Sequence, residues 1–391
     1  MPGKQVSVGI LGCGSFAKMQ NIPNCLANKR IKIEALCDID PSRMDEAQEA
    51  FGLGGVKKFA DFETLLSDPK IEAALAATNH DTHVAMVAAA ARHGKHILIE
   101  KPMTLWHGDS VKILRLVKQS GIKLCVDYNR PFSPAFKFIK REFEKHRANP
   151  VNGPWRSKRD GAMPRLYEEG AANFAINVQD EIDSYAPVHI DALRGGGQVV
   201  GESCHFFDLA CHMIGKRPTR IFATGSKRLS HAAIIDFEDG SIATIHFFAT
   251  GTFDYPKERH ELTYAGALFI NEHYVEASVY GAGEAVKEYF GYTRDEMEGE
   301  IKAKGLAGYL ERRALMQRRF VLQNAMPAMD VDKGHYDLLD GFVDSILKGG
   351  IAPVDERRGL RATYLANLAN ESIRTGMPMP VNRDEMEVFV I

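Results

Sequence analysis

Short apolar runs alternate with segments of helical periodicity over the first third of the chain. The apolar runs are VSVGIL, IKIEALCD, AALAAT, HILIE and IKLCVDY, which begin at Val6, Ile31, Ala73, His96 and Ile122. The segments between them that have a helical pattern are residues 17–27, 41–51, 84–93 and 109–119. Strands separated by helices of this length are typical of βαβ units. We therefore expect an α/β domain with a doubly wound parallel sheet over residues 1–128.

The pattern changes near Asn173 to alternating strands with turn signals. The strand-like stretches are RIFATGS, HAAIIDF, SIATIHFF, HELTYA and ALFINE. Two of them flank Glu238-Asp239-Gly240, which predicts a β-hairpin. We expect residues 129–391 to form a second, α+β domain with a largely antiparallel sheet. Its C-terminal helices, from about residue 335, are expected to pack back on the first domain.

Two stretches are rich in charge and do not fit the strand pattern. They are residues 140–172 and residues 284–324, where EAVKEYF, RDEMEGEIKAKG and GYLERRALMQRRF have a helical pattern. Solvated surface helices are the plainer interpretation, and a lid or a subunit contact is the alternative.

The amino-acid composition limits which cellular compartment and which partners we expect. The 391 residues are 45% hydrophobic and 26% charged, which is ordinary for a folded protein. A formal charge of -2 leaves no excess of cations for a nucleic acid. No apolar run approaches the roughly 18 residues of a membrane helix, and no export signal is visible. The 6 cysteines form no disulfide framework in so long a chain, so we expect a reduced, cytoplasmic protein without nucleic-acid or membrane partners.

A glycine-rich turn, Gly12-Cys13-Gly14-Ser15-Phe16-Ala17, joins the first predicted strand to a helix. Glycines in such a turn let backbone amides approach a pyrophosphate at the helix N-terminus. Asp38 ends the next strand 21 residues after Ala17, where an acid binds the hydroxyls of an adenosine ribose. These residues predict an NAD site, and Arg43 keeps NADP as the less favoured alternative.

Two further motifs carry polar groups. Lys101, in Glu100-Lys101-Pro102, stands at the carboxyl end of a strand, where doubly wound sheets bind ligands. An isolated lysine there would more simply be a surface residue. A triple glycine at residues 195–197 leads into VVGESCHFFD. At about 100° per residue, Glu202 and Asp208 lie close to the direction of His205, so we expect one polar stripe on an apolar helix.

Taken together, GILGCGSFA, TNHDTHVAMVAAAARHGKHILIEKP and GGGQVVGESCHFFDLA resemble the glucose-fructose oxidoreductase / inositol dehydrogenase (Gfo/Idh/MocA) family. The resemblance covers most of the chain. It implies an N-terminal Rossmann domain, a C-terminal domain whose open-faced sheet often makes oligomer contacts, and NAD(P)-dependent oxidation of a sugar or cyclitol hydroxyl. We therefore expect a homodimer or homotetramer that acts on a small sugar, glycoside or cyclitol.

The resemblance also assigns residues. It implies that Lys101 and His205 face the substrate. The expected cofactor site comprises Gly12, Gly14, Ser15, Phe16, Ala17, Asp38, Arg43, Thr78, Asn79, His83, Glu100, Lys101 and Asn129. The expected substrate site comprises Lys101, Arg130, Asn177, Asp191, Glu202 and His205.

One position departs from the family. Its commonest form has an aspartate four residues before the histidine, and this chain has Gly201 there, followed by Glu202. We expect Glu202 to serve the same end, by orienting His205 or by holding a substrate hydroxyl. The resemblance therefore supports the family's mechanism for this chain more strongly than it supports any particular substrate.

Several of these residues have plainer alternatives. Metal-compatible side chains gather at Cys204, His205, Asp208, Cys211 and His212, but the cysteines face away from His205, so we expect no metal. His212 is expected to pair with Asp208. His83 is as readily a capping or buried histidine. A surface or structural role is the simpler interpretation for Asn177, Asp191 and Arg194.

The expected reaction is hydride transfer between a secondary ring carbinol and NAD. His205 is the expected base, Lys101 stabilises charge on the reacting oxygen, and Glu202 assists them. One alternative is an NAD-dependent glycosidase that oxidises transiently, eliminates and re-reduces, with Tyr255 or His260 as an additional acid. A second alternative is a non-catalytic dinucleotide-bound sensor, against which the retention of Lys101 and His205 argues.

Overall fold

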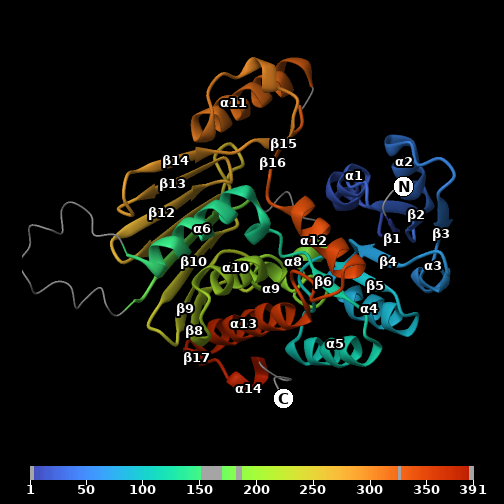
Figure 1. The fold of residues 1–391 in the computed structure, drawn as a ribbon, viewed down its shortest axis with the longest axis horizontal. Coiled ribbons are helices and arrows are strands. Elements are labelled where there is room, and N and C mark those ends of the chain that lie inside the picture. Colours follow the sequence, from blue (N-terminus) through green and yellow to red (C-terminus); the bar gives the residue numbers. More distant parts are fainter. Residues whose placement is uncertain (1–3, 151–169, 182–186, 325–326, 387–391) are drawn as a thin grey trace, which may run out of the picture.

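A computed structural model describes residues 4–150, 170–181, 187–324 and 327–386. The first part is a sheet of six parallel strands in the order β3-β2-β1-β4-β5-β6, as expected for a doubly wound fold (Figure 1). Its strands are β1 (Val6–Leu11), β2 (Ile31–Cys37), β3 (Lys57–Phe59), β4 (Ala73–Ala76), β5 (His96–Ile99) and β6 (Leu124–Val126). The helices between them are η1 (Ala17–Asn21), α1 (Ile22–Ala27), α2 (Pro41–Phe51), α3 (Phe62–Ser67), η2 (His80–Thr82), α4 (His83–Arg92) and α5 (His107–Ser120).

Local sequence explains where these helices begin and end. Asp40 caps α2 by accepting a hydrogen bond from the Ser42 amide, Pro41 occupies the first turn, and Gly52 ends the helix in a left-handed conformation. The helix after the glycine-rich turn starts differently. Its first turns are a π-helix, in which the Ile22 amide donates to the Ala17 carbonyl, because Pro23 has no N–H for the regular ladder.

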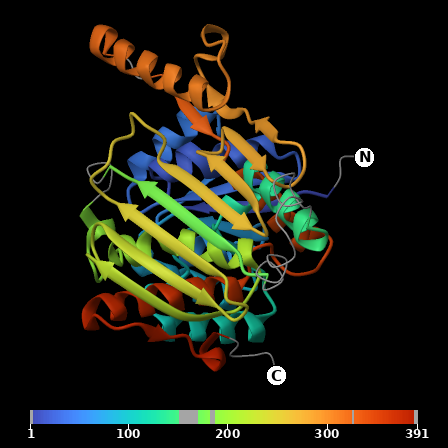
Figure 2. The same cartoon turned by 90° about the vertical axis from the view of Figure 1, so that its left-hand side faces the viewer.

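The second part is a nine-stranded sheet in the order β14-β13-β12-β11-β7-β10-β9-β8-β17. It is antiparallel except where β7 pairs with β10, and the predicted hairpin is confirmed as β9 and β10. Its strands are β7 (Asn173–Gln179), β8 (Pro218–Gly225), β9 (His231–Phe237), β10 (Ile242–Phe248), β11 (Glu258–Tyr264), β12 (Ala267–Glu272), β13 (Glu276–Tyr280), β14 (Val286–Tyr289) and β17 (Met379–Pro380). Helices α6 (Pro134–Ala148), α10 (Cys204–Ile214) and α13 (Glu356–Thr375) cover one face, and Figure 2 shows the other face uncovered.

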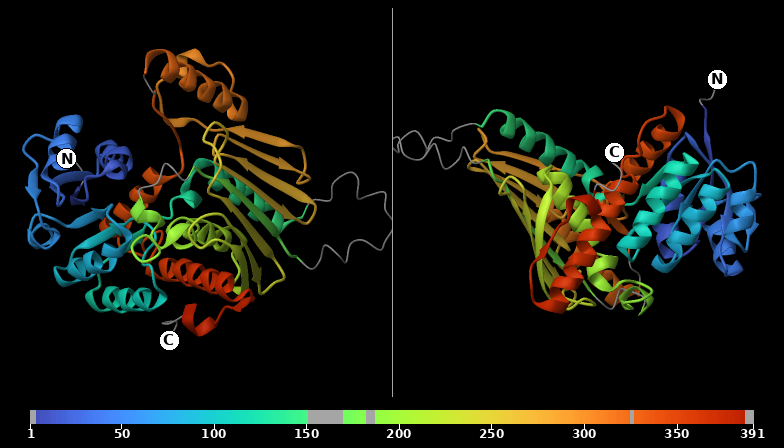
Figure 3. Two further views of the ribbon diagram at one scale, coloured as in Figure 1. Left: turned by 180° about the vertical axis from the view of Figure 1, so that it is seen from behind. Right: turned by 90° about the horizontal axis from the view of Figure 1, so that it is seen from below.

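Helix α13 lies between the two sheets (Figure 3). Leu360 and Ala362 belong to the core around the parallel sheet, whereas Leu365 and Ala369 belong to the core under the antiparallel sheet. Helix α12 (His335–Leu347) likewise buries Phe342 against the parallel sheet. The remaining short helices are η3 (Arg130–Phe132), α8 (Pro187–Ile190), α9 (Gly197–Gly201) and α14 (Arg383–Met386). No helix in the described ranges is long and apolar enough to cross a membrane.

The helical prediction for residues 284–324 is wrong in its first half. EAVKEYF forms β14, because its backbone pairs with β13 and extends the sheet by one edge strand. RDEMEGEIKAKG begins in β15 (Tyr292–Asp295), which pairs with β16 (Met329–Val331), and contains only the short turn η5 (Glu298–Glu300). The second half is helical as expected, in α11 (Gly305–Gln323). Most of the charged stretch at 140–172 lies outside the described residues.

Candidate active site

The glycine-rich turn has the shape that a pyrophosphate requires. Gly12 has φ of 86°, and a Cβ there would lie 2.3 Å from the Ala77 carbonyl oxygen, so only glycine fits beside β4. At Gly14 a Cβ would meet no heavy atom within 4 Å, so the turn borders open space there. Ser15, Phe16 and Ala17 follow directly in the first helical turns. These residues fit a dinucleotide phosphate.

Asp38 lies directly beside this turn. Its carboxylate accepts hydrogen bonds from the Cys13 amide at 2.8 Å and the Asp40 amide at 2.9 Å. The predicted acid therefore stands at the turn it was expected to serve, with further lone pairs for ribose hydroxyls. Arg43 instead points to the surface, where its Nε lies 3.6 Å from the Asp40 carboxylate.

The loop after β4 supports the cofactor side less directly. The Thr78 hydroxyl hydrogen bonds with the Thr82 hydroxyl at 2.8 Å, and Asn79 precedes η2. His83 is completely buried, and its Nδ1 lies 2.8 Å from the Pro102 carbonyl oxygen. Its burial lowers the pKa of His83, so the ring is neutral. The Nδ1 contact fixes the turn after β5, whereas the buried Nε2 of His83 has no hydrogen-bond partner in the described residues.

Buried acids line the carboxyl ends of β5 and β6. Burial, and then the charge of Asp127, raise the pKa of Glu100 well above its usual range. Burial alone would raise the pKa of Asp127, but His335, whose Nδ1 lies 3.0 Å from the carboxylate, lowers it below its usual value. Asn129 donates to the Lys333 carbonyl at 2.9 Å, and its buried Oδ1 has no partner in the described residues. An unpartnered amide oxygen here suits a hydrogen-bonding ligand.

Lys101 turns toward the second domain. Its ammonium donates to Glu202 Oε2 at 2.6 Å and to the Gly201 carbonyl at 2.9 Å. Glu202 is buried, and its other oxygen receives Lys257 at 3.1 Å and Arg130 at 3.4 Å. Burial alone would raise the pKa of Glu202, but Lys101 and Lys257 hold it well below its usual range. Glu202 is therefore an anion that three cations share.

Arg130 links Glu202 to a second buried carboxylate. Its guanidinium binds Glu258 through two hydrogen bonds of 2.9 Å, which is the strong fork geometry. Lys333 donates to the same Glu258 at 3.1 Å, and the Tyr274 hydroxyl donates to it at 2.5 Å. Lys257 also pairs with Asp180 at 2.6 Å, which extends the network to the end of β7.

His205 stands on the first turn of α10 beside this network. It is 6% exposed, and its Nδ1 is buried with no hydrogen-bond partner in the part of the chain that the structure describes. Burial lowers the pKa of His205 well below its usual range, and the charges of Arg130 and Lys101 lower it further. The imidazole is therefore neutral and carries a lone pair that can accept a proton.

The expected polar stripe does not form. Glu202 lies in a non-helical turn with φ of -122° between α9 and α10, so it approaches Lys101 from a break in the helix. Asp208 faces α13, where Arg358 binds its carboxylate through two hydrogen bonds. The expected Asp208 pair with His212 is therefore replaced by a pair with Arg358.

The other predicted substrate residues lie elsewhere. Asn177 is on the uncovered face of the sheet, where its Oδ1 lies 3.1 Å from His246 Nδ1, because alternate residues of β7 point to opposite faces. Asp191 accepts from the Leu193 and Arg194 amides at 2.9 Å each and thereby closes a turn. The structure does not bring Asn177 or Asp191 to Lys101.

The structure also places the residues that were named for the metal-site and glycosidase alternatives. No group of three His, Cys, Asp or Glu side chains in the described ranges could hold a metal ion. Burial raises the pKa of Cys204 to about 12 and that of Cys211 to about 11, so both thiols stay protonated. Tyr255 is 48% exposed, and His260 is buried with its Nδ1 3.1 Å from the Asn271 amide nitrogen.

The Gly195 carbonyl oxygen explains the glycine at position 201, and His80, which sequence reasoning missed, lies beside that oxygen. Its ring stacks on His189, and its Nδ1 lies 2.8 Å from the Gly195 carbonyl oxygen. A Cβ on Gly201 would lie 2.8 Å from that same oxygen and 3.3 Å from His80 Cε1. The space that an acid would need at Gly201 is therefore filled, and Lys101 receives its carboxylate from Glu202.

Three further missed residues are Lys257, Glu258 and Lys333. Lys257 directly precedes β11, which pairs with β7, so it meets Asp180 at the end of that strand. Lys333 comes from the loop between β16 and α12. Their positions depend on the register of strands distant in sequence, and no local motif marks them.

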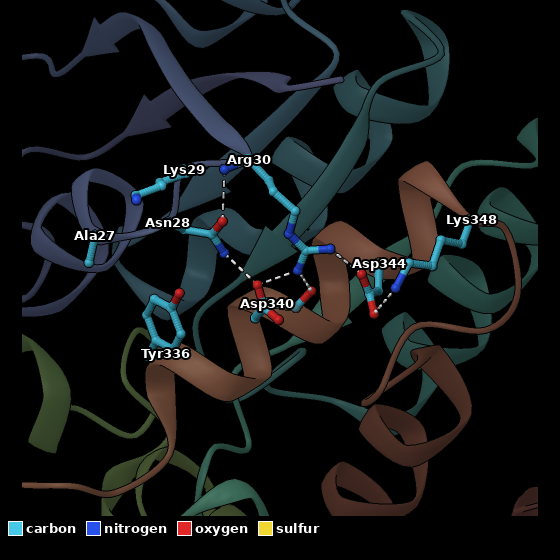
Figure 4. A pocket seen from close by; sticks show the side chains of 8 residues that line it. All are labelled: Ala27, Asn28, Lys29, Arg30, Tyr336, Asp340, Asp344 and Lys348. Carbon is cyan, nitrogen blue, oxygen red and sulfur yellow. Dashed lines mark hydrogen bonds and ion pairs between the residues drawn. The ribbon is translucent and has the colours of Figure 1, made fainter. Parts of the chain in front are cut away.

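A separate hollow of about 400 Å³ lies between α1 and α12 (Figure 4). Its polar groups bind one another: Arg30 pairs with Asp340 and Asp344, and Asn28 donates to Asp340 at 2.7 Å. These contacts join the last helices to the first domain and leave the hollow without the converging chemistry found around Lys101.

Residues 6–128 match the sequence model of GFO_IDH_MocA, described as an oxidoreductase family with an NAD-binding Rossmann fold. Residues 189–381 match the C-terminal alpha/beta domain of the same oxidoreductase family. Among curated proteins, the chain is 28% identical over 398 residues to the uncharacterized oxidoreductase YrbE of Bacillus subtilis, covering 99% of each chain. It is 23% identical over 274 residues to a myo-inositol 2-dehydrogenase of Thermotoga maritima, covering 67% of this chain and 74% of that protein.

Solved structures share the fold at lower sequence identity. A levoglucosan dehydrogenase in complex with NADH and levoglucosan has a TM-score of 0.73 at 17% identity, covering 97% of this chain and 100% of that one. A putative myo-inositol dehydrogenase from Sinorhizobium meliloti has a TM-score of 0.69 at 21% identity, with coverage of 97% and 100%. At these identities the likeness concerns the fold.

Proposed function

Since this chain belongs to the Gfo/Idh/MocA family of NAD-dependent oxidoreductases that act on CH–OH groups, we propose that it transfers hydride between a secondary ring hydroxyl of a sugar, glycoside or cyclitol and NAD. One observation carries the proposal. His205 is a neutral, buried histidine whose Nδ1 has no hydrogen-bond partner among the described residues, and it lies close enough to Lys101 and Arg130 for their charges to lower its pKa.

The cofactor is held by residues of the first domain. Gly12 and Gly14 admit the pyrophosphate, Asp38 receives the adenosine ribose, and Asn129, whose amide oxygen has no partner in the described residues, is available to the nicotinamide end of the cofactor. When bound, NAD supplies the hydride acceptor. The protein has to orient NAD and the substrate and to exclude water from the site.

His205 and Lys101 divide the work at the reacting hydroxyl. Hydride leaves carbon only as the hydroxyl proton leaves oxygen, so a neutral imidazole must take that proton, and His205 is neutral because it is buried. Lys101, whose ammonium group donates to Glu202 at 2.6 Å, stabilises negative charge that develops on the oxygen. Glu202 acts as a positioning residue, because it fixes Lys101 and lies beside His205.

The test is to substitute each group separately in the full chain. We expect Lys101→Met and His205→Gln each to lower kcat by about 10²- to 10⁴-fold, with NADH binding retained. Lys348→Met and His93→Gln are matched controls, because both residues are exposed and bind other surface residues in place of Lys101 or Glu202. NADH formation from a panel of sugars, cyclitols and glycosides gives the rate. Unchanged turnover in both test variants contradicts the assignment.

The same panel separates the glycosidase alternative. An oxidising and re-reducing glycosidase releases aglycone without steady accumulation of NADH, whereas a dehydrogenase accumulates NADH from the free sugar. We expect NADH, because neither acid named for the alternative contacts Lys101 or His205 in the described residues. Tyr255 is 48% exposed, and His260 is buried with its Nδ1 3.1 Å from the Asn271 amide nitrogen and its Nε2 3.7 Å from the Glu258 carboxylate.

The proposed assembly is a homodimer or homotetramer formed through the uncovered face of the nine-stranded sheet. This face exposes large apolar side chains, including Ile234, Phe248 and Tyr280, at 43%, 54% and 43%. Exposed apolar side chains that gather on one face of a sheet mark an interaction surface. Two copies joined through this face would cover it while leaving the glycine-rich turn accessible.

A further inference from the structure

His335 lies where the C-terminal part of the chain meets the glycine-rich turn. It is the first residue of α12, and its ring packs edge-on against Phe16, with 5.6 Å between the ring centroids. It also contacts Asp127 and Asn129, which follow β6 and precede it by more than 200 positions in the sequence. His335 therefore joins the turn after β1 to the residues at the end of β6.

The hydrogen bonds of His335 determine which of its ring nitrogens carries hydrogen. Its Nδ1 lies 3.0 Å from the Asp127 carboxylate. Burial alone would raise the pKa of Asp127, but His335 lowers it below its usual value, so the carboxylate is ionised and can only accept. Nδ1 therefore donates to Asp127, and Nε2 is left to accept a hydrogen bond.

The side-chain amide of Asn129 has one orientation that satisfies its neighbours. Its nitrogen lies 2.9 Å from the Lys333 carbonyl oxygen, which can only accept, so the nitrogen and not the amide oxygen faces that carbonyl. The same nitrogen lies 3.1 Å from His335 Nε2, which accepts its second hydrogen. The amide oxygen then has no hydrogen-bond partner in the described residues, although Asn129 is only 1% exposed.

The segment that supplies these two acceptors is packed closely against the turn that carries Asn129. Gly334 lies between the two acceptors and has φ of 88°. A Cβ there would lie 2.3 Å from the Ser133 amide nitrogen and 2.7 Å from the Asn129 backbone oxygen, so only glycine fits. This close approach holds the Lys333 carbonyl and the His335 ring beside the Asn129 amide.

A dinucleotide bound at the glycine-rich turn would extend toward Asn129. Ligands of doubly wound sheets lie across the carboxyl ends of the strands. Asp38 follows β2 and is proposed to bind the adenosine ribose, and the sheet order places β4, β5 and β6 on the opposite side of β1. The nicotinamide end of the cofactor is therefore expected toward β5 and β6, where the Asn129 oxygen offers a buried acceptor.

We propose that His335 is a positioning residue for the cofactor. Together with the Lys333 carbonyl it holds both N–H groups of Asn129, so that the amide oxygen accepts a hydrogen bond from the carboxamide N–H of nicotinamide. A buried acceptor without a partner costs free energy, so a ligand that donates to it is favoured. This role rests on the proposed NAD-dependent function and specifies how the nicotinamide end is recognised.

The experiment compares dinucleotides that differ in the carboxamide alone. Calorimetry measures how tightly full-length protein, freed of bound dinucleotide, binds NADH, its thiocarboxamide analogue and reduced 3-acetylpyridine adenine dinucleotide. The thiocarboxamide keeps the N–H donors, whereas the acetyl group has a methyl in place of the amino group. We expect the first two to bind about 3- to 10-fold more tightly than the acetylpyridine dinucleotide, as one hydrogen bond allows.

Substitutions test whether His335 acts through Asn129. His335→Phe keeps a ring beside Phe16 but removes both hydrogen bonds, and Asn129→Leu removes the amide. Each should weaken NADH binding by about 3- to 10-fold and leave binding of the acetylpyridine dinucleotide nearly unchanged, which also shows that the variant is folded. The double variant should bind NADH no more weakly than Asn129→Leu alone.

Two further variants serve as controls. His335→Gln offers a side-chain oxygen that can accept from Asn129 in place of Nε2, so it should retain most of the preference for NADH. His93→Phe changes a surface histidine that binds Glu63, and it should bind all three dinucleotides as the unsubstituted protein does.

The outcomes separate this role from the function on which it rests. Equal binding of the three dinucleotides, or variants that weaken all three alike, overturns the carboxamide contact and leaves the NAD-dependent function intact. A double variant in which the two single losses multiply overturns the positioning role of His335, because the two residues then act independently. Failure of the unsubstituted protein to bind any dinucleotide overturns the proposed function as well.

Discussion

Replacing Glu202 by glutamine tests how the site is held together. Glutamine has the same shape, but it removes the negative charge that Lys101, Lys257 and Arg130 share at 2.6, 3.1 and 3.4 Å. The three cations then lose the carboxylate that they have in common among the described residues. Because the side chain is only 6% exposed, water cannot screen the three cations in its place.

The expected loss is large for a single isosteric change. Removing one partner of a buried ion pair costs about 3 to 5 kcal/mol, and the retained amide oxygen places Glu202→Gln at the lower end, about 3 kcal/mol. Glu202 also raises the pKa of His205, so the variant should lower that pKa further and weaken the base. Lys101 loses its anchor in the same step, so kcat should fall as well.

Urea unfolding measures the stability and NADH formation measures kcat. Glu276→Gln is the matched control, because Glu276 is 12% exposed and pairs with the half-exposed Lys287, so about 0 to 1 kcal/mol is expected there. Lys257 keeps its pair with Asp180 at 2.6 Å in Glu202→Gln, so Lys257→Met should not restore the stability; the loss in the double variant should instead be smaller than the sum of the two single losses, because each single variant already removes the Glu202–Lys257 pair. A Glu202→Gln variant as stable as the control, or a double variant no more stable than the sum of its parts, refutes the shared-anion account.

The remaining predictions concern the base, the departure from the family and the assembly. Because the pKa of His205 is lowered below its usual value of 6.5, its neutral form persists as pH falls, so kcat/KM should stay level through pH 6.5 and drop only well below it; an inflection at or above 6.5 in the initial-rate profile contradicts this. Gly201→Asp should lose about 1 to 3 kcal/mol in urea unfolding, because its Cβ would lie 2.8 Å from the Gly195 backbone oxygen, and His80→Ala should not rescue it; a stable, active variant contradicts the packing argument. Phe248→Glu should dissociate the assembly in analytical ultracentrifugation, whereas the exposed Lys348→Met should not; unchanged sedimentation of both variants excludes the uncovered sheet face as the interface.

The fold was predictable because its signals are local. The alternation of strands and helices, the glycine-rich turn and Asp38 all lie within one βαβ unit, and the hairpin around Asp239 has its turn in the sequence. The helical prediction at EAVKEYF failed because the decisive contact, pairing with β13, is made by another strand. Propensity there competes with an edge of a sheet that the local sequence does not reveal.

The candidate site likewise contains residues that a local motif predicts and residues that only the tertiary structure reveals. The motif residues Lys101, Glu202 and Arg130 meet in the structure, although their roles stay a prediction. Asn177 was misplaced because the face of a strand changes with every residue, and a pattern of this length does not fix which face is covered. Lys257 and Lys333 were missed because they reach Glu202 and Glu258 only through the register of distant strands and loops.

Helix α13 makes the folding of the first domain depend on residues that are synthesised late. It supplies Leu360 and Ala362 to the core of the first domain, and the loop before it gives the Val354 carbonyl to the Val126 amide at 2.9 Å. The dinucleotide-binding domain is therefore synthesised first, but its core is completed only by residues that come more than 200 positions later in the chain. A fragment that stops at residue 128 should expose this unfinished surface, so the cofactor domain is a product of the whole chain and not a module that precedes it.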